Sequence, residues 1–299
     1  MKIKEEWIKE SKVNSERYIS LYQESIENGD EFWNKHGGRI DWYKKYTKIR
    51  NTKYSNKDVS IKWYEDGKLN VSYNCIDRHA KENPNRVAII WEGDDPKDVK
   101  KITYKELLLN VSKAANVLKK IGIKKGDRVT IYLTMIPELA YTMLACARIG
   151  AIHSIIFGGF SAESIAGRIQ DCGSKFIITA DEGVRGGKKI PLKLTVDKAL
   201  ETCPEVERCL IIKRTNKDIK LKTNRDIFYE DLINEVEDIC EPEVLNAEDP
   251  LFILYTSGST GKPKGVVHST AGYNLWSHLT FKWIFDIREK DVYWCTADV

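Results

Sequence analysis

Short apolar segments alternate with helix-like segments over most of this chain, and that alternation limits its fold more than any other feature. Each apolar segment is rich in β-branched residues and bounded by turn-forming residues, which predicts a buried strand. The helix-like segments between them imply parallel pairing, because a parallel connection needs a crossover. The predicted fold class is therefore α/β, with helices around mostly parallel sheets. The strands are predicted at 86–93, 127–134, 151–157, 175–180, 209–213 and 251–256.

Local signals place the ends of the helices between these strands. Thr103 and Glu106 form a capping-box pattern ahead of a helix that should end near Gly122. Pro137 is expected to open the next helix, and Ser161 to cap the one after it.

The two ends of the chain differ from this pattern. Residues 1–74 are polar and rich in Trp, Tyr and Lys, which indicates short helices and loops lying on another surface. Residues 291–299, DVYWCTADV, read as one more strand. Because a domain rarely stops on an apolar strand, we expect the chain to be truncated there.

Composition excludes several classes of protein. Across 299 residues, Lys+Arg 48 against Asp+Glu 44 leaves a net charge of only +4, so a nucleic-acid partner is not favoured. The seven cysteines form no CxxC pair and the five histidines are scattered, so reduced thiols are expected and no metal site. There is no signal-like segment and no apolar run of about 18 residues, which predicts a cytoplasmic protein without a membrane partner.

The most informative segment is a loop that directly follows the last buried strand. Its glycines allow backbone N–H groups to approach oxygens, its hydroxyls donate hydrogen bonds and its lysines neutralise charge, all of which suits a polyphosphate. A flexible linker remains open on composition alone, although the buried strand before the loop argues against it. The loop consists of Thr256, Ser257, Gly258, Ser259, Thr260, Gly261, Lys262, Pro263, Lys264 and Gly265.

Two other nucleotide-binding motifs do not fit this loop. The P-loop of kinases and GTPases needs Gly where Thr256 stands and Ser or Thr where Pro263 stands. No Gly-x-Gly-x-x-Gly follows any predicted strand, so a dinucleotide site is not supported.

The order YTSGSTGKPKG at 255–265 resembles the phosphate loop of the adenylate-forming ligases, which include acyl-CoA synthetases, luciferases and adenylation domains. The resemblance implies the large N-terminal domain of such an enzyme, incomplete at its C-terminus, and Mg²⁺ bound with ATP. It assigns a catalytic role to Lys262. It also implies that the ATP phosphates are held by Thr256, Ser257, Gly258, Ser259, Thr260, Gly261, Lys262, Lys264 and Gly265.

Further segments narrow the resemblance to the acetyl-CoA synthetase branch of that superfamily. These are residues 31–46, 62–79 and 135–193, and with them the resemblance covers nearly the whole chain. It divides the chain into an N-terminal region, 1–74, and a partial AMP-binding domain, 75–299.

A basic segment, EGVRGGKK at 182–189, has chemistry of its own. A compact cluster of cations around two glycines could hold a phosphate monoester, although a solvated run of charges fits the residues alone as well. The resemblance implies that this stretch contacts the nucleotide end of CoA. Many relatives have Arg where this chain has Lys188, which keeps the charge and loses bidentate geometry. The residues that match are Arg185, Gly186, Gly187 and Lys188.

The turn FGGF at 157–160 follows a predicted strand, and a purely structural role remains open for it. The resemblance places this turn, with Gly158 and Gly159, beside the adenine of CoA.

The resemblance implies an AMP-forming acetate–CoA ligase that converts ATP, acetate and CoA through acetyl-adenylate. Propionate is the nearest alternative substrate. A non-catalytic nucleotide- or CoA-binding remnant and an inert fragment also remain open. The adenine-binding motifs, the acyl pocket and the C-terminal catalytic lysine of such enzymes are expected beyond Val299. We therefore expect little ligase activity from these 299 residues alone; acyl specificity and oligomeric state are left undecided.

Overall fold

The structure, a computed structural model, describes residues 4–256, 261–294 and 296–297. The chain forms two compact units, each assembled from separate stretches of sequence. The first contains Met1–Leu69, Leu245–Asp249 and Ser269–Ala297, and the second is built mainly from Asn70–Val244 and Pro250–His268. The domain boundary between residues 74 and 75 was predicted from composition and from family resemblance, whereas this division into units follows the packing of the chain.

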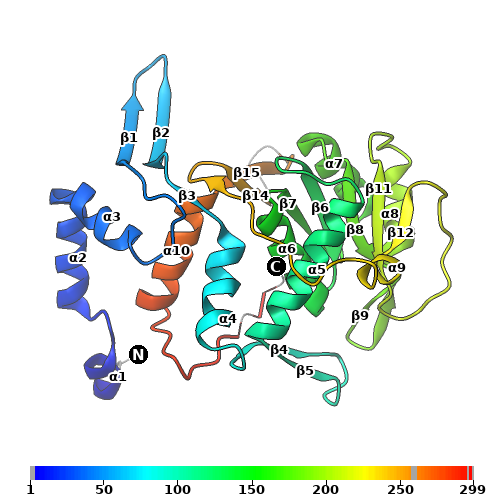
Figure 1. Ribbon diagram of the computed structural model, residues 1–299, viewed down its shortest axis with the longest axis horizontal. Coiled ribbons are helices and arrows are strands. Elements are labelled where there is room, and N and C mark those ends of the chain that lie inside the picture. Colours follow the sequence, from blue (N-terminus) through cyan, green and yellow to red (C-terminus); the bar gives the residue numbers. More distant parts are fainter. Residues whose placement is uncertain (1–3, 257–260, 295, 298–299) are drawn as a thin grey trace. The chain divides into compact units, whose positions relative to one another are not determined.

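The first unit is mainly helical, with one long hairpin. Strands β1 and β2 pair antiparallel in that hairpin, which Figure 1 shows in blue. The short strands β3 and β13 also pair antiparallel, although far apart in sequence. The elements are α1 (Glu5–Glu10), α2 (Ser15–Glu27), α3 (Gly29–Gly37), β1 (Lys48–Tyr54), β2 (Val59–Glu65), β3 (Lys68–Leu69), β13 (Leu245–Asn246) and α10 (Thr270–Trp283).

The aromatic residues of the N-terminal region contribute to a core inside this unit. The ring of Trp283, from α10, lies 4.8 Å from the ring of His36, in α3. The N-terminal aromatic residues therefore pack on α10 as well as on one another. The buried core residues are Ile40, Tyr46, Tyr64, Leu69, Ala247, Ala271, Leu275 and Leu279.

No helix among the described residues of the chain is long and apolar enough to cross a membrane.

The second unit contains the predicted alternation of strands and helices. Its elements are the π-helical turn η1 (Tyr73–Asp77), α4 (Arg78–Glu82), β4 (Val87–Glu92), β5 (Val99–Thr103), α5 (Tyr104–Lys120), β6 (Arg128–Leu133), α6 (Pro137–Ile149), β7 (Ile152–Phe157), α7 (Ala162–Cys172), β8 (Phe176–Ala180), β9 (Gly183–Arg185), β10 (Lys188–Ile190), α8 (Leu192–Leu200), β11 (Arg208–Ile212), β12 (Asp226–Phe228), α9 (Tyr229–Ile233), β14 (Pro250–Thr256) and β15 (Lys264–Ser269).

A seven-stranded sheet in the order β12-β11-β8-β6-β7-β14-β15 organises this unit. The pairs β6–β7, β6–β8, β8–β11, β11–β12 and β7–β14 are all parallel, which confirms the predicted fold class. The chain moves one way along the sheet from β6 to β7 and the other way from β7 to β8. Right-handed crossovers therefore put α6 and α7 on opposite faces. Accordingly, α5 packs on α6 and α7 packs on α8.

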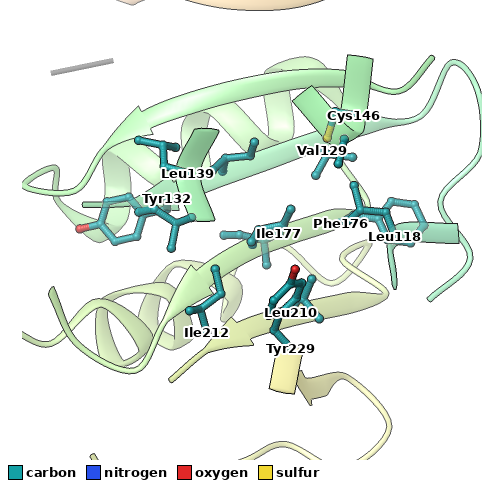
Figure 2. Close-up of a cluster of buried hydrophobic side chains, with 14 of the residues drawn as sticks. Leu118, Val129, Tyr132, Leu139, Cys146, Phe176, Ile177, Leu210, Ile212 and Tyr229 are labelled. Atoms are coloured by element: carbon teal, nitrogen blue, oxygen red, sulfur yellow. The ribbon is translucent and has the colours of Figure 1, made fainter. Parts of the chain in front are cut away.

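The core of the second unit lies between the sheet and its helices. Figure 2 shows apolar side chains of α5, α6 and α9 gathered with those of β6, β8 and β11. Each fully buried side chain of this size contributes about 1.5–3 kcal/mol to folding. The residues labelled in that view are Leu118, Val129, Tyr132, Leu139, Cys146, Phe176, Ile177, Leu210, Ile212 and Tyr229.

The predicted helix signals are confirmed, whereas the predicted last strand is not. The Glu106 N–H donates to Thr103 Oγ1 at 3.3 Å, and the Thr103 N–H donates to the Glu106 carboxylate at 2.8 Å. In the described residues of 291–299 there is no strand. Val292 is 72% exposed and Trp294 82% exposed, and the ring of Tyr293 packs on Phe281 and Phe285, so the described part of this run packs on aromatic rings and not beside a strand.

Candidate active site

The predicted site residues follow strands whose carboxyl ends meet at one edge of the sheet. The turn 157–160 follows β7, the basic segment 182–189 follows β8, and the phosphate loop follows β14. The chain leaves β6 toward one face of the sheet and leaves β7 and β8 toward the other. In open α/β sheets, ligands bind in the crevice that such a change of direction creates.

A cavity of about 160 Å³ lies at this crevice. It brings together the ends of β6 and β7, the hairpin after β8 and the hairpin formed by β4 and β5. Of the residues predicted to contact CoA, Gly158 and Arg185 both line it. The other polar or aromatic lining residues include Trp91, Asp94, Thr134, Phe157 and Arg214.

The basic segment is a hairpin, not an irregular loop. Arg185 pairs with Lys188 across β9 and β10, so both cations lie on the same face. Gly186 and Gly187 form the turn with φ of 57° and 73°, as a type I′ turn requires. A Cβ added at either glycine would meet nothing within 4 Å, so the backbone conformation and not space selects glycine. The two opposed cations repel each other, and a phosphate bound between them would remove that repulsion.

Neighbouring segments hold this hairpin in place. The Gly187 N–H donates to Asp94 Oδ2 at 2.7 Å. The Arg185 guanidinium carbon lies 4.8 Å from the centre of the Phe157 ring, a cation–π contact. The indole N–H of Trp91 donates to the Met135 carbonyl at 2.7 Å. Sequence reasoning missed Trp91 and Asp94, because both approach the hairpin only through tertiary packing.

The turn after β7 favours glycine at its first position. A Cβ at Gly158 would lie 3.0 Å from the Leu133 carbonyl oxygen, so a side chain there would require the backbone at the end of β6 to shift. The Tyr132 hydroxyl donates to the Phe160 carbonyl at 3.0 Å, and burial raises the pKa of Tyr132 and keeps its proton in place. Gly159 is exposed and does not line the cavity, so its predicted contact with CoA remains a prediction.

The phosphate loop joins two neighbouring strands. Thr256 is the last residue of β14, Gly261 has a φ of 81°, and Lys264 opens β15. A Cβ at Gly265 would lie 3.2 Å from the Tyr255 ring, so glycine lets β15 approach β14. Strand β15 was not among the predicted strands, although the pair Val266–Val267 signals one. The predicted residues Ser257, Gly258, Ser259 and Thr260 lie outside the described part of the chain.

A second cavity, of about 620 Å³, lies beside the described end of this loop. It is lined by Lys262 together with Glu163, Arg168, Asp171 and Tyr255. The Tyr255 hydroxyl donates to Asp171 Oδ2 at 2.6 Å, and burial together with this hydrogen bond raises the pKa of Tyr255. In the described residues, no group of three His, Cys, Asp or Glu side chains could hold a metal ion.

The chain is similar to known families and proteins along almost its whole length. Residues 76–299 match the AMP-binding enzyme family, and residues 18–75 match the acetyl-coenzyme A synthetase N-terminus. Acetyl-coenzyme A synthetase from Parvibaculum lavamentivorans is 57% identical over 294 residues, 98% of this chain and 45% of that protein. The enzyme of the same name from Brucella anthropi is 59% identical over 291 residues, 96% of this chain and 44% of that protein.

Among solved structures, the acetoacetyl-CoA synthetase from Streptomyces lividans superposes with a TM-score of 0.81. The alignment covers 90% of this chain and 41% of that one at 24% identity, so it shows the likeness of fold alone. The chain thus spans less than half the length of the curated relatives it matches.

Proposed function

This chain belongs to the AMP-binding enzyme family, and from that premise we propose that the complete protein is an acetate–CoA ligase. In the proposed first step, an acetate oxygen attacks the α-phosphorus of ATP, giving acetyl-adenylate and pyrophosphate. In the second, the sulfur of CoA attacks the acyl carbon, AMP leaves, and the thiol proton is released. The observation that carries the proposal is 57–59% identity over almost the whole chain to enzymes named acetyl-coenzyme A synthetase.

The phosphate loop supports the first step. Lys262 would neutralise charge on the phosphates as pyrophosphate leaves, with the hydroxyl and glycine N–H groups of the loop as further donors. Such positioning and charge stabilisation supply most of the catalysis in phosphoryl transfer. Mg²⁺ would enter with ATP, bound through phosphate oxygens, which are ligands that it prefers.

The hairpin and the turn support the second step. Arg185 and Lys188, on one face of the β9–β10 hairpin, would hold a phosphate at the nucleotide end of CoA. The tight turn at Gly186 and Gly187 fixes the distance between these cations. Gly158 leaves room beside Arg185 in the same cavity for the base of the nucleotide.

The proposal is tested on Lys262 in the complete protein. Acetate-dependent exchange of pyrophosphate into ATP reports the first step without CoA. We expect Lys262→Ala to slow this exchange about 100-fold, the usual loss when one charge-stabilising group is removed. Lys282→Ala, at the exposed end of α10, is the control and should leave the exchange unchanged. Unaltered exchange in Lys262→Ala would refute the catalytic role of this lysine.

The same assay separates the alternatives. Faster exchange with propionate than with acetate would assign the protein to propionate. Binding of ATP or CoA with no exchange on either acid would identify a non-catalytic binding protein. The cytoplasmic location remains a prediction from the sequence.

A further inference from the structure

A series of cationic and aromatic side chains in contact connects the predicted CoA site with the strand that enters the phosphate loop. The Arg185 guanidinium lies 4.8 Å from the Phe157 ring, and that ring meets the Phe160 ring edge to face at 5.6 Å. The guanidinium of Arg168, in α7, lies 4.8 Å from the Phe160 ring and 5.4 Å from the Tyr255 ring. The series is therefore unbroken from β9 to the end of β14.

Arg168 contacts a ring on each side of it: Phe160, toward the predicted CoA site, and Tyr255, toward the phosphate loop. Its Nη1 donates to the Ser164 carbonyl at 2.8 Å, which anchors the guanidinium to its own helix. Burial lowers the pKa of Arg168, which means that the cation is partly dehydrated. Dehydration strengthens the attraction of a cation to ring faces. The contacts with Phe160 and Tyr255 are thus stronger than those of a solvated surface arginine.

Tyr255 lies between this contact and the phosphate loop. It directly precedes Thr256, and its ring is close to the returning strand, since a Cβ added at Gly265 would lie 3.2 Å from it. The hydrogen bond from its hydroxyl to Asp171 fixes the other end of the ring. Tyr255, Arg168 and Lys262 line the same cavity. The Tyr255 ring therefore lies next to both described ends of the loop, at Thr256 and at Gly265.

We infer that Arg168 is a positioning residue shared by the two substrate sites, and that it couples the binding of CoA to the binding of ATP. The guanidinium stacks on both rings only when the turn and the end of β14 stand at the right spacing. A ligand that fixes one ring therefore favours the position of the other, and the effect is reciprocal. This inference rests on the proposed function, since it takes the turn as a CoA contact and the loop as an ATP contact.

The test uses the complete protein and desulfo-CoA, a CoA analogue that lacks the thiol and cannot accept the acyl group. The KM for ATP in acetate-dependent pyrophosphate exchange is measured with and without saturating analogue. In the wild type we expect the two KM values to differ about five-fold or more. In Arg168→Met the ratio should fall toward one; the ratio compares each protein with itself, so it does not depend on the variant's own exchange rate without analogue. A wild-type ratio of one, or an unchanged ratio in Arg168→Met, overturns the inference.

Further variants separate coupling from general damage. Phe160→Leu removes the ring on the CoA side and should lower the ratio as well, so the test does not depend on one variant. Arg168→Lys keeps the charge without the planar stack and should retain part of the ratio. Arg208→Met, at the start of β11, is the matched control, and a lowered ratio there would also overturn the inference. If the wild type shows no exchange at all, the proposed function fails instead.

Discussion

At the scale of single residues, burial decides how titratable groups behave in this protein. His153, in β7, is 6% exposed, and burial lowers its pKa from 6.5 to about 4. Its ring stacks on that of Phe252, the residue opposite it in β14, at 5.4 Å. Nδ1 of His153 has no hydrogen-bond partner in the described structure. The folded protein therefore holds this imidazole neutral.

This predicts a loss of stability on acidification. Because the folded pKa lies below the unfolded one, the unfolded chain binds the extra proton first, and the free energy of unfolding falls as pH drops from about 6.5 toward 4. We expect the second unit to lose about 2 kcal/mol at pH 4.5 through His153, at 1.36 kcal/mol per pKa unit. Urea unfolding of the wild type and of His153→Phe at pH 7 and at pH 4.5 measures this loss of stability.

The variant also separates this effect from that of another buried histidine. Burial, together with Arg39, lowers the pKa of His36 to about 4, so acid also weakens the first unit. Only the His153 contribution disappears in His153→Phe. If acid destabilises both proteins equally, the assignment to His153 is wrong.

At the scale of elements, the β9–β10 hairpin shows how far sequence reasoning reaches. The glycines and cations of EGVRGGKK were identifiable from their chemistry and from resemblance. The hairpin itself was not predicted, because its strands are only three residues each. Its partner Asp94 and the contact of Arg168 with Tyr255 arise between segments distant in sequence. The strands and helix ends were predictable, because apolar runs and caps are local signals.

Substitution in the hairpin turn should separate backbone strain from packing. Gly187→Ala places a side chain at a φ of 73°, which costs about 1–2 kcal/mol, and should raise the KM for CoA in the complete protein. Gly187→Asn should cost less, because asparagine tolerates this conformation. Denaturant unfolding and CoA-dependent turnover measure the two effects.

Gly167 is the matched control for that series. It lies within α7, and a Cβ added there meets nothing within 4 Å. Gly167→Ala should therefore stabilise the protein by about 1 kcal/mol, the opposite sign. Equal destabilisation at both positions would show that the loss at Gly187 does not come from its backbone conformation.

At the scale of the whole molecule, the first unit is discontinuous in sequence. Four of its buried core residues lie before residue 70, and the other four are Ala247, Ala271, Leu275 and Leu279. The composition change near residue 74 gave no indication of this, because an amphipathic segment does not reveal which later segment will cover it. The C-terminal strand predicted at 291–299 failed for a related reason, since an apolar run becomes a strand only where it finds a partner.

A polypeptide of residues 1–74 should therefore not fold alone. It lacks half of the buried side chains of its core, and small domains have little stability to spare. In far-ultraviolet circular dichroism, this polypeptide should show little secondary structure and no cooperative transition on heating. Addition of a peptide of residues 245–285, which carries the missing side chains, should restore a transition. Cooperative unfolding of 1–74 by itself would contradict this prediction.

The same discontinuity sets an order of events during synthesis. Residues 1–69 leave the ribosome first, but their last core partner, Leu279, is 210 residues away. At roughly 5–20 residues per second, those partners follow about 10–40 s later. All the helices and strands of the second unit, from η1 to β15, emerge within that interval. During that interval the aromatic side chains of the nascent N-terminal segment lack the core partners that residues 247–279 supply.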